Sequence, residues 1–162
     1  MAETLDVTTL LPNKFEPLRK HRWVFNIEGI DAYLMKTAAR PQMAQGEIII
    51  EWINTKRYLA GKNEFQPLNV TLYDPIAPSG AQQVMEWIRV HHESVSGRAG
   101  YADFYKRDCQ LKMLDPVGTV VQLWDLKGVF ITDANWNDLD YATPDAVEIA
   151  LTLRYDNAIL QF

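Results

Sequence analysis

The chain has one cysteine, Cys109, among its 162 residues, so no disulfide can form within a single copy. Pairs of cysteines at metal-binding spacing are absent for the same reason. In the stretch RDCQLKML, Cys109 alternates with polar residues and is in register with Leu111 and Met113. We therefore interpret Cys109 as a small core residue and not as a nucleophile, and we expect the chain to fold in a reducing cytosol.

Long hydrophobic runs are absent as well, since none approaches the roughly 20 residues that a helix needs to cross a bilayer. The first residues, MAETLDVTTLLPNK, carry acids early and have no basic segment before an apolar one, which argues against a secretory signal. The composition, 48% hydrophobic and 23% charged, is that of a globular protein. We expect an N-terminal arm over residues 1–20, where Pro12 and Pro17 accompany a lack of periodicity, and a single domain over residues 21–162.

Basic residues are missing from one long window, between Lys127 and Arg154. That window contains five acidic residues, namely Asp133, Asp138, Asp140, Asp145 and Glu148, and the whole chain has a net charge of −5. A protein that grips DNA usually clusters lysines and arginines, which displace counterions from the phosphates. The sequence has no such cluster, and this argues against tight binding of nucleic acid.

Motifs for catalysis and nucleotide binding are absent, including GxSxG, HExxH, the P-loop and the dinucleotide fingerprint. His91 and His92 are neighbours on a predicted helix and point about 100° apart, so they are poorly placed to bind one metal ion. Asp138 and Asp140 have the spacing of alternate calcium ligands, but the glycine and the bidentate glutamate of an EF-hand loop do not follow. We predict that the chain is not an enzyme and has no cofactor or metal site.

Alternating apolar and polar side chains, the pattern of half-buried strands, recur along most of the chain. In RWVFNIE, for example, Trp23, Phe25 and Ile27 share one face, and the same alternation returns in QPLNVTLYD and in DAVEIALTLRYDN. The connections are of hairpin length and have no βαβ rhythm. The sequence therefore predicts a mainly β fold, an antiparallel β-sandwich or barrel of about eight strands.

One segment, from Ser79 to about Ser94, has helical periodicity. The Ser79 hydroxyl can cap the first turn, and Gln82 three residues later completes a capping box. The apolar stripe of this helix consists of Val84, Trp87, Ile88, His91 and Val95. We predict one flanking α-helix over about residues 79–94, anchored to the sheet by Trp87.

A second distinctive segment is a predicted β-hairpin that protrudes, over about residues 46–60, with its turn at Asn54-Thr55. One face carries Ile48, Ile50 and Trp52, and the other carries Ile49, Glu51 and Ile53, so both faces are largely apolar. A strand that is apolar on both faces either lies inside a sandwich or is covered by another subunit.

The order of these elements resembles that of the tail tube proteins of contractile-tailed bacteriophages. The similarity covers roughly residues 20–156. Its most specific parts are KRYLAG, which precedes the NVTLYD strand, and LKGVFITDANWNDLDY, which precedes the last long strand. Each stretch is weak by itself, but their order and the length of the chain fit the family.

The resemblance implies a structural protein without catalytic residues. Such proteins form homohexameric rings in which each subunit gives strands to one inner β-barrel, and the rings stack into the tail tube. The implied function is a conduit for phage DNA, which passes through the lumen without sequence-specific binding. The implied partners are further copies of the chain, the tail sheath, the tape measure, the baseplate and the tail terminator, in a virion tail assembled in the host cytoplasm.

In that family the hairpin reaches toward the neighbouring subunit or ring, so the expected contact residues are Glu47, Ile49, Glu51, Trp52, Lys56, Arg57 and Tyr58. The same fold occurs in the tubes of type VI secretion systems and phage-like particles, which are the alternative reading. A monomeric ligand-binding β-barrel and an enzyme with a spatially assembled site are further alternatives.

Overall fold

The computed structural model describes residue 11 and residues 14–162. Of the expected arm, residues 1–20, it therefore describes residue 11 and residues 14–20, which form no helix or strand; the remainder lies outside the described residues. The helices and strands in the described part are β1 (Trp23–Ile27), the 3-10 helix η2 (Ala32–Leu34), β2 (Met35–Ala38), β3 (Met43–Trp52), β4 (Thr55–Phe65), β5 (Leu68–Tyr73), α1 (Gly80–His91), α2 (Ala102–Tyr105), β6 (Arg107–Leu114), β7 (Val120–Asn135), β8 (Glu148–Arg154) and β9 (Asn157–Leu160). No helix in these residues is long and apolar enough to span a membrane.

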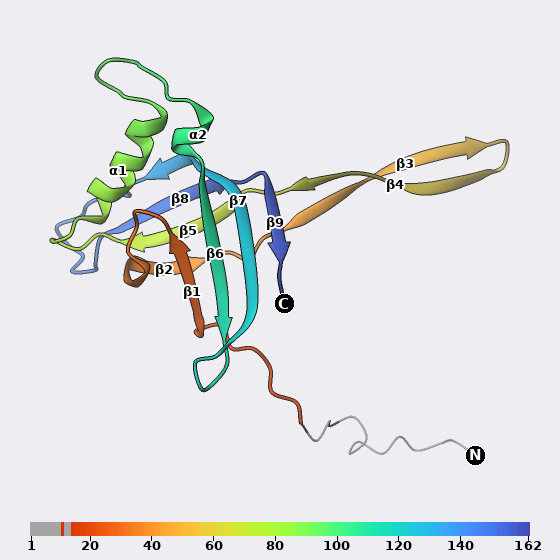
Figure 1. Ribbon diagram of the computed structural model, residues 1–162, viewed down its shortest axis with the longest axis horizontal. Helices are drawn as coiled ribbons and strands as arrows, with labels where there is room; N and C mark the ends of the chain where they lie inside the picture. Colours follow the sequence, from red (N-terminus) through yellow and green to blue (C-terminus); the bar gives the residue numbers. More distant parts are fainter. Residues whose placement is uncertain (1–10, 12–13) are drawn as a thin grey trace.

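The body of the molecule consists of antiparallel strands in the order β1-β6-β7-β8-β5-β2, with β9 also paired to β7. The first half of β7 pairs with β6 and β9, and its second half pairs with β8. Strand β7 therefore belongs to two sheets, one made of β1, β6, β7 and β9 and the other of β7, β8, β5 and β2 (Figure 1). The predicted antiparallel, mainly β architecture with one long helix is confirmed.

Strand β7 changes sheet just after Gly128, since Val129 still pairs with β6 and Phe130 pairs with β8. Gly128 lies at this bend. Its φ of +66° lies in the left-handed region, which glycine adopts without steric cost. The Gly128 N–H donates to a carboxylate oxygen of Asp108 at 3.2 Å, and a Cβ at this position would collide with the carboxylate of Asp156. Lys127 on one side of the bend forms an ion pair with Asp108 at 2.9 Å. The bend is thus fixed by backbone conformation and by carboxylates on two neighbouring segments.

The core lies between the two sheets and is built by the inward side of each strand. Phe25 faces Leu111 across β1 and β6, and Leu72 faces Ile149 across β5 and β8. The fully buried side chains include Phe25, Leu68, Leu72, Val84, Trp87, Leu126, Val129, Ile149, Leu151 and Leu153. Each large aliphatic side chain buried in this way contributes about 1.5–3 kcal/mol to folding.

Helix α1 begins as the sequence predicted, because the Ser79 side chain accepts a hydrogen bond from the Gln82 N–H at 3.4 Å. Trp87 is 1% exposed and its indole N–H donates to the Tyr105 carbonyl at 2.7 Å, which confirms it as the anchor. The helix ends at His91 and not near residue 94. Val95 is therefore exposed and does not belong to the apolar stripe, because the backbone turns back after Glu93.

Candidate subunit interface

The hairpin formed by β3 and β4 stands apart from the two sheets and forms a two-stranded sheet of its own. It projects along the long axis of the molecule, well beyond the body (Figure 1). Every residue of β3 is exposed, and in β4 only Gly61 and Phe65 are partly covered. The strands extend from Met43 to Phe65, so the hairpin is longer than the predicted range of 46–60 but lies where it was expected.

The register of the hairpin decides which side chains share a face, because directly paired residues point to the same side. One face, the apolar face, combines the pairs Ile48–Leu59, Ile50–Arg57 and Trp52–Thr55. The other, the mixed face, combines Glu47–Ala60, Ile49–Tyr58 and Glu51–Lys56. On the mixed face the Lys56 ammonium lies 2.7 Å from the Glu51 carboxylate.

Large apolar side chains on the hairpin are in contact with water to an unusual degree. Trp52 is 55% exposed, Tyr58 is 61% exposed, and Ile53 in the turn is fully exposed. Large apolar side chains concentrated on one exposed element mark an interaction site. Burial against a partner would gain roughly 25 cal/mol for each Å² removed from water.

All seven residues expected at the contact lie on this hairpin. Glu47, Ile49, Glu51, Lys56 and Tyr58 share the mixed face, whereas Trp52 and Arg57 lie on the apolar face. Sequence reasoning left out Ile48, Ile50 and Leu59, which complete the apolar face. The strand register identifies them, because Ile48 pairs with Leu59 and Ile50 pairs with Arg57.

The outer face of the sheet β2-β5-β8-β7 has a different character, with many short side chains, most of them polar. Its members include Thr37, Asn69, Thr71, Asp133, Ala150 and Thr152. Two basic residues on this face are held by acids: Lys36 by Glu148, and Arg154 by Glu64 at 3.1 Å. The hydrogen bond to Glu148 raises the pKa of Lys36, so this lysine keeps its charge at neutral pH.

This sheet also has two open edges within the described residues. Strand β2 pairs with β5 alone, and the second half of β7 pairs with β8 alone. Unpaired strand edges are sites where another chain can add its own strand. The sheet can therefore be extended on both sides by copies of itself.

The groups that sequence reasoning considered for chemistry have structural roles. Cys109 lies on β6 with its side chain buried in the core, and burial raises the pKa of its thiol to about 12, so it is not a nucleophile at neutral pH. The ring of His91 packs on Tyr105, with 4.5 Å between centroids. Across the part of the chain that the structure describes, no three histidine, cysteine or acidic side chains are grouped to hold a metal ion.

No protein-family model matches the chain, and no curated protein matches it. Several solved structures, in contrast, have a similar fold. A chain in the sheath/tube terminator of PVC, an extracellular contractile injection system, superposes with a TM-score of 0.73 at 14% identity, covering 91% of this chain and 99% of that one. A chain in the PVC sheath-tube complex superposes with a TM-score of 0.71 at 14% identity, covering 98% and 99%.

The tail tube of SPP1 matches with a TM-score of 0.58 at 15% identity, covering 89% of this chain and 78% of that one. At a sequence identity of 14–15%, these matches show that the fold is shared. The chain thus shares the fold of these three chains, in agreement with the resemblance seen in its sequence.

Proposed function

We propose that this chain is the building block of a tube, assembled from stacked rings of identical subunits. The observation that carries the proposal is the β3–β4 hairpin, which exposes apolar side chains on both of its faces and pairs with no other described strand of the chain. A hairpin of this kind needs a partner on each face, and identical subunits supply one. The function is structural and requires no catalytic step.

The second support is the sheet β2-β5-β8-β7. Pairing the β2 edge of one copy with the β7 edge of the next extends the sheet laterally, and six copies close it into one barrel without free edges. Its outer face of threonine, asparagine and neutralised ion pairs would then line the lumen. Such a wall offers no array of free positive charge to hold phosphates.

The specific assignment that we favour is the inner tail tube of a contractile-tailed bacteriophage. The tube would carry phage DNA during ejection, inside a tail sheath, around a tape measure protein and between a baseplate and a terminator. The sheet face described above supports this assignment, because DNA must slide along the wall without binding to it.

The alternative is the inner tube of a related contractile injection system, and the fold similarity to chains in the PVC assemblies favours it. The two assignments differ in the particle that contains the protein. Immunogold labelling of particles from the producing cells would separate them, since a phage tail ends in a DNA-filled capsid and an injection system does not.

The proposal is tested on the purified full-length chain by size-exclusion chromatography with light scattering, followed by negative-stain electron microscopy. The expected mass is six times that of the 18.6 kDa chain or larger, with rings or hollow tubes in the images. A monodisperse 18.6 kDa species at high protein concentration would contradict the proposal and would favour a monomeric ligand-binding barrel.

A further inference from the structure

A groove runs between β1 and β2, the first and the last strand in the order of the sheet. One part of it, with a volume of about 510 Å³, is lined by Trp23, Leu111 and Met113 among others. The other part, of about 660 Å³, shares Trp23 and continues along β1 to Phe25 and Met35. Leu111, Met113 and Phe25 belong to the buried core. The groove is therefore an opening between the two sheets that reaches apolar side chains of the interior.

The rim of this groove is basic. Lys20 lines both of its parts and Arg40 lines the first. Within the described part of the chain no acid forms an ion pair with Lys20 or Arg40, and the Arg40 guanidinium donates to the side-chain carbonyl of Gln122 at 2.9 Å. Arg19 and Lys36, the other basic residues of the lining, already have acidic partners. An occupant of the groove thus meets an apolar floor and two positive charges that no described acid neutralises.

The first ten residues of the chain, MAETLDVTTL, have the opposite charge. They carry Glu3 and Asp6 and no basic residue. In an extended backbone Leu5 and Val7 fall on one side and Asp6 falls on the other. Two apolar side chains can therefore enter the groove while a carboxylate stays at its rim, which is the complementarity that an apolar groove with a basic rim requires.

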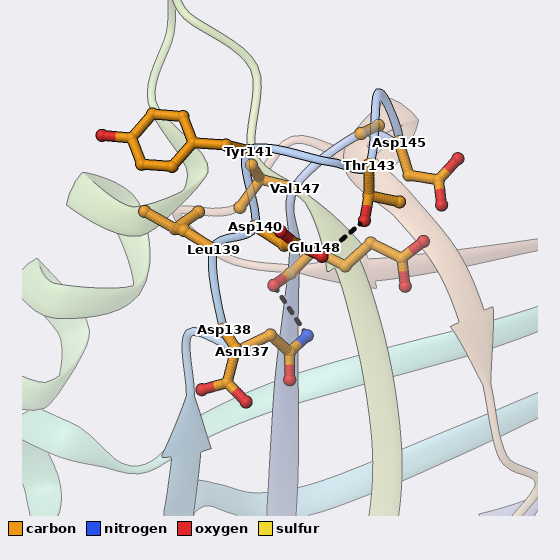
Figure 2. A pocket seen from close by; sticks show the side chains of 10 residues that line it. Asn137, Asp138, Leu139, Asp140, Tyr141, Thr143, Asp145, Val147 and Glu148 are labelled. Carbon is orange, nitrogen blue, oxygen red and sulfur yellow. Dashed lines mark hydrogen bonds between the residues drawn. The ribbon is translucent and has the colours of Figure 1, made fainter.

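The hollow at the β7–β8 loop, residues 136–147, has the wrong charge for the same segment. Leu139 and Tyr141 are exposed on this loop, but the hollow beside them is lined by Asp138, Asp140 and Asp145 (Figure 2). An acidic segment is repelled there, since like charges that face each other across a contact are unfavourable. Charge thus favours the groove between β1 and β2.

The position of the described residues before β1 favours a second copy as the source of the segment. Residues 18–20 line the groove, and the chain before them leads away from the body (Figure 1). To enter the groove of its own copy, the preceding segment would have to reverse its direction. A neighbouring copy can supply the same segment without a reversal.

We propose that this groove is the docking site for residues 1–10 of a second copy of this chain, with the segment added to the free edge of β1. The inference deepens the proposed function and rests on it in one respect, that identical copies come together. Strand β1 pairs with β6 alone among the described strands, so its other edge can accept an extended segment. The segment needs only this edge, and the edge of β2 stays available for the lateral pairing that closes the ring.

The test is disulfide cross-linking of two full-length variants, Leu5→Cys and Tyr33→Cys, mixed in equal amounts and oxidised. Tyr33 lines the groove and is 68% exposed, and the buried Cys109 does not compete for the oxidant. A disulfide between the two variants is expected, seen as a dimer on a non-reducing gel that collapses on reduction, and mass spectrometry of the linked peptides identifies it. The matched control uses Val95→Cys in place of Tyr33→Cys, since Val95 is 95% exposed in the loop after α1.

Mixed dimers from the Tyr33 variant and several-fold fewer from the Val95 variant support the proposal, and electron microscopy of the same samples reports on tubes independently. Tubes without mixed dimers overturn the docking site and leave the proposed function standing. Mixed dimers without rings or tubes support the docking site and overturn the tube. The double variant Leu5→Cys/Tyr33→Cys separates the copies: a disulfide within one chain, with no mixed dimers from the single variants, overturns docking in a second copy.

The charge argument has its own test in the same assay. Lys20→Glu/Arg40→Glu, added to the chain with the groove cysteine, places like charges beside Glu3 and Asp6, so the yield of mixed dimers is expected to fall several-fold. Glu3→Lys/Asp6→Lys, added to the chain with the N-terminal cysteine, should then restore the yield. Restoration supports the proposed pairing, because a loss of folding in one chain is not reversed by a change in the other. A yield that neither change alters, or that stays low when both chains are reversed, overturns it.

Discussion

The guanidinium of Arg107 lies over the indole ring of Trp87, with its Cζ 4.7 Å from the ring centroid. The same guanidinium donates a hydrogen bond to the Glu28 carbonyl, in the turn that follows β1. Burial lowers the pKa of Arg107, yet the group remains charged at any physiological pH. These contacts join α1, β6 and the end of β1, so one residue pair connects the helix to the sheet.

Replacing Trp87 with alanine is expected to lower the free energy of unfolding by about 3–5 kcal/mol, because a buried indole and its cavity are lost. Trp87→Phe is the matched control. It keeps an aromatic ring under Arg107 but loses the hydrogen bond to Tyr105, so a smaller loss is expected. Urea unfolding followed by circular dichroism measures both. A Trp87→Ala chain as stable as wild type would refute the anchoring role.

Alternation of side chains was sufficient to predict the strands and the two-faced hairpin. In β7 the two alternating runs TVVQLWDL and KGVFITDA, which meet near Gly128, form one strand in the structure. In the structure Gly128 bends the strand and does not reverse it, and the Asp108 carboxylate accepts a hydrogen bond from the Gly128 N–H at the bend. Strand β9 was missed because it has four residues and follows an interruption at Asp156.

The bend at Gly128 provides a second prediction. Gly128→Ala forces an L-residue into a positive φ and pushes its Cβ against Asp156, so we expect a loss of about 1–3 kcal/mol in the free energy of unfolding. Gly118→Ala is the control, because its φ is also positive but nothing lies within 4 Å of the added Cβ. Thermal unfolding of the two variants separates the collision from the backbone strain. Equal losses would show that Asp156 yields without cost.

Only part of the candidate interface could be predicted from the sequence. The contact residues on the hairpin could be expected because exposed apolar strands need a partner, and their division between two faces follows from strand register. The loop of residues 136–147 has no local signal of a contact, because Leu139 and Tyr141 are separated by acids and have no period. Its position opposite the hairpin depends on the way in which distant strands pair, and no local pattern encodes that.

The hairpin itself can be tested by charge reversal. Lys56→Glu/Arg57→Glu breaks the ion pair with Glu51 and places like charges at a partly buried contact, so tubes are expected to be lost or shortened several-fold while the subunit stays folded. The control Arg89→Glu/Arg98→Glu changes the net charge equally, away from the hairpin. Electron microscopy gives tube length, and circular dichroism gives folding. Full-length tubes from the hairpin variant at the same salt concentration would exclude the hairpin as the contact.

The pH dependence of stability should include a contribution from Asp108. Hydrogen bonds from Lys127 and from the Gly128 N–H lower its pKa below the ordinary value of 3.8. A carboxylate with a depressed folded-state pKa stabilises the fold above the unfolded-state pKa, and this contribution disappears as the pH falls through the folded-state pKa. Asp108→Asn should therefore destabilise the chain at pH 7, and this destabilisation should become progressively smaller as the pH falls below 3.8. A difference between the two chains that stays constant from pH 7 into this acidic range would contradict this assignment.

The charge of the proposed lumen wall gives the last prediction. Thr71 and Asp133 lie on the polar outer face of the sheet, on β5 and β7, and the basic residues Lys36 and Arg154 on that face are already paired with acids. If this face lines the channel, assembled wild-type tubes should not retain duplex DNA at physiological salt. Thr71→Lys/Asp133→Lys adds positive charges that repeat around each ring, and because each neutralised phosphate releases counterions, the variant tubes should bind DNA.

The control for this prediction is Thr71→Gln/Asp133→Gln, which adds bulk at the same positions without positive charge. Co-sedimentation of fluorescent duplex with preformed tubes measures retention, and retention by the lysine variant should fall steeply as salt rises, since the displaced counterions set the slope. A structure of the wild-type tube provides the independent reading. A continuous ring of unpaired lysines or arginines along the bore, together with DNA held at physiological salt, would overturn the conduit and indicate a binding role.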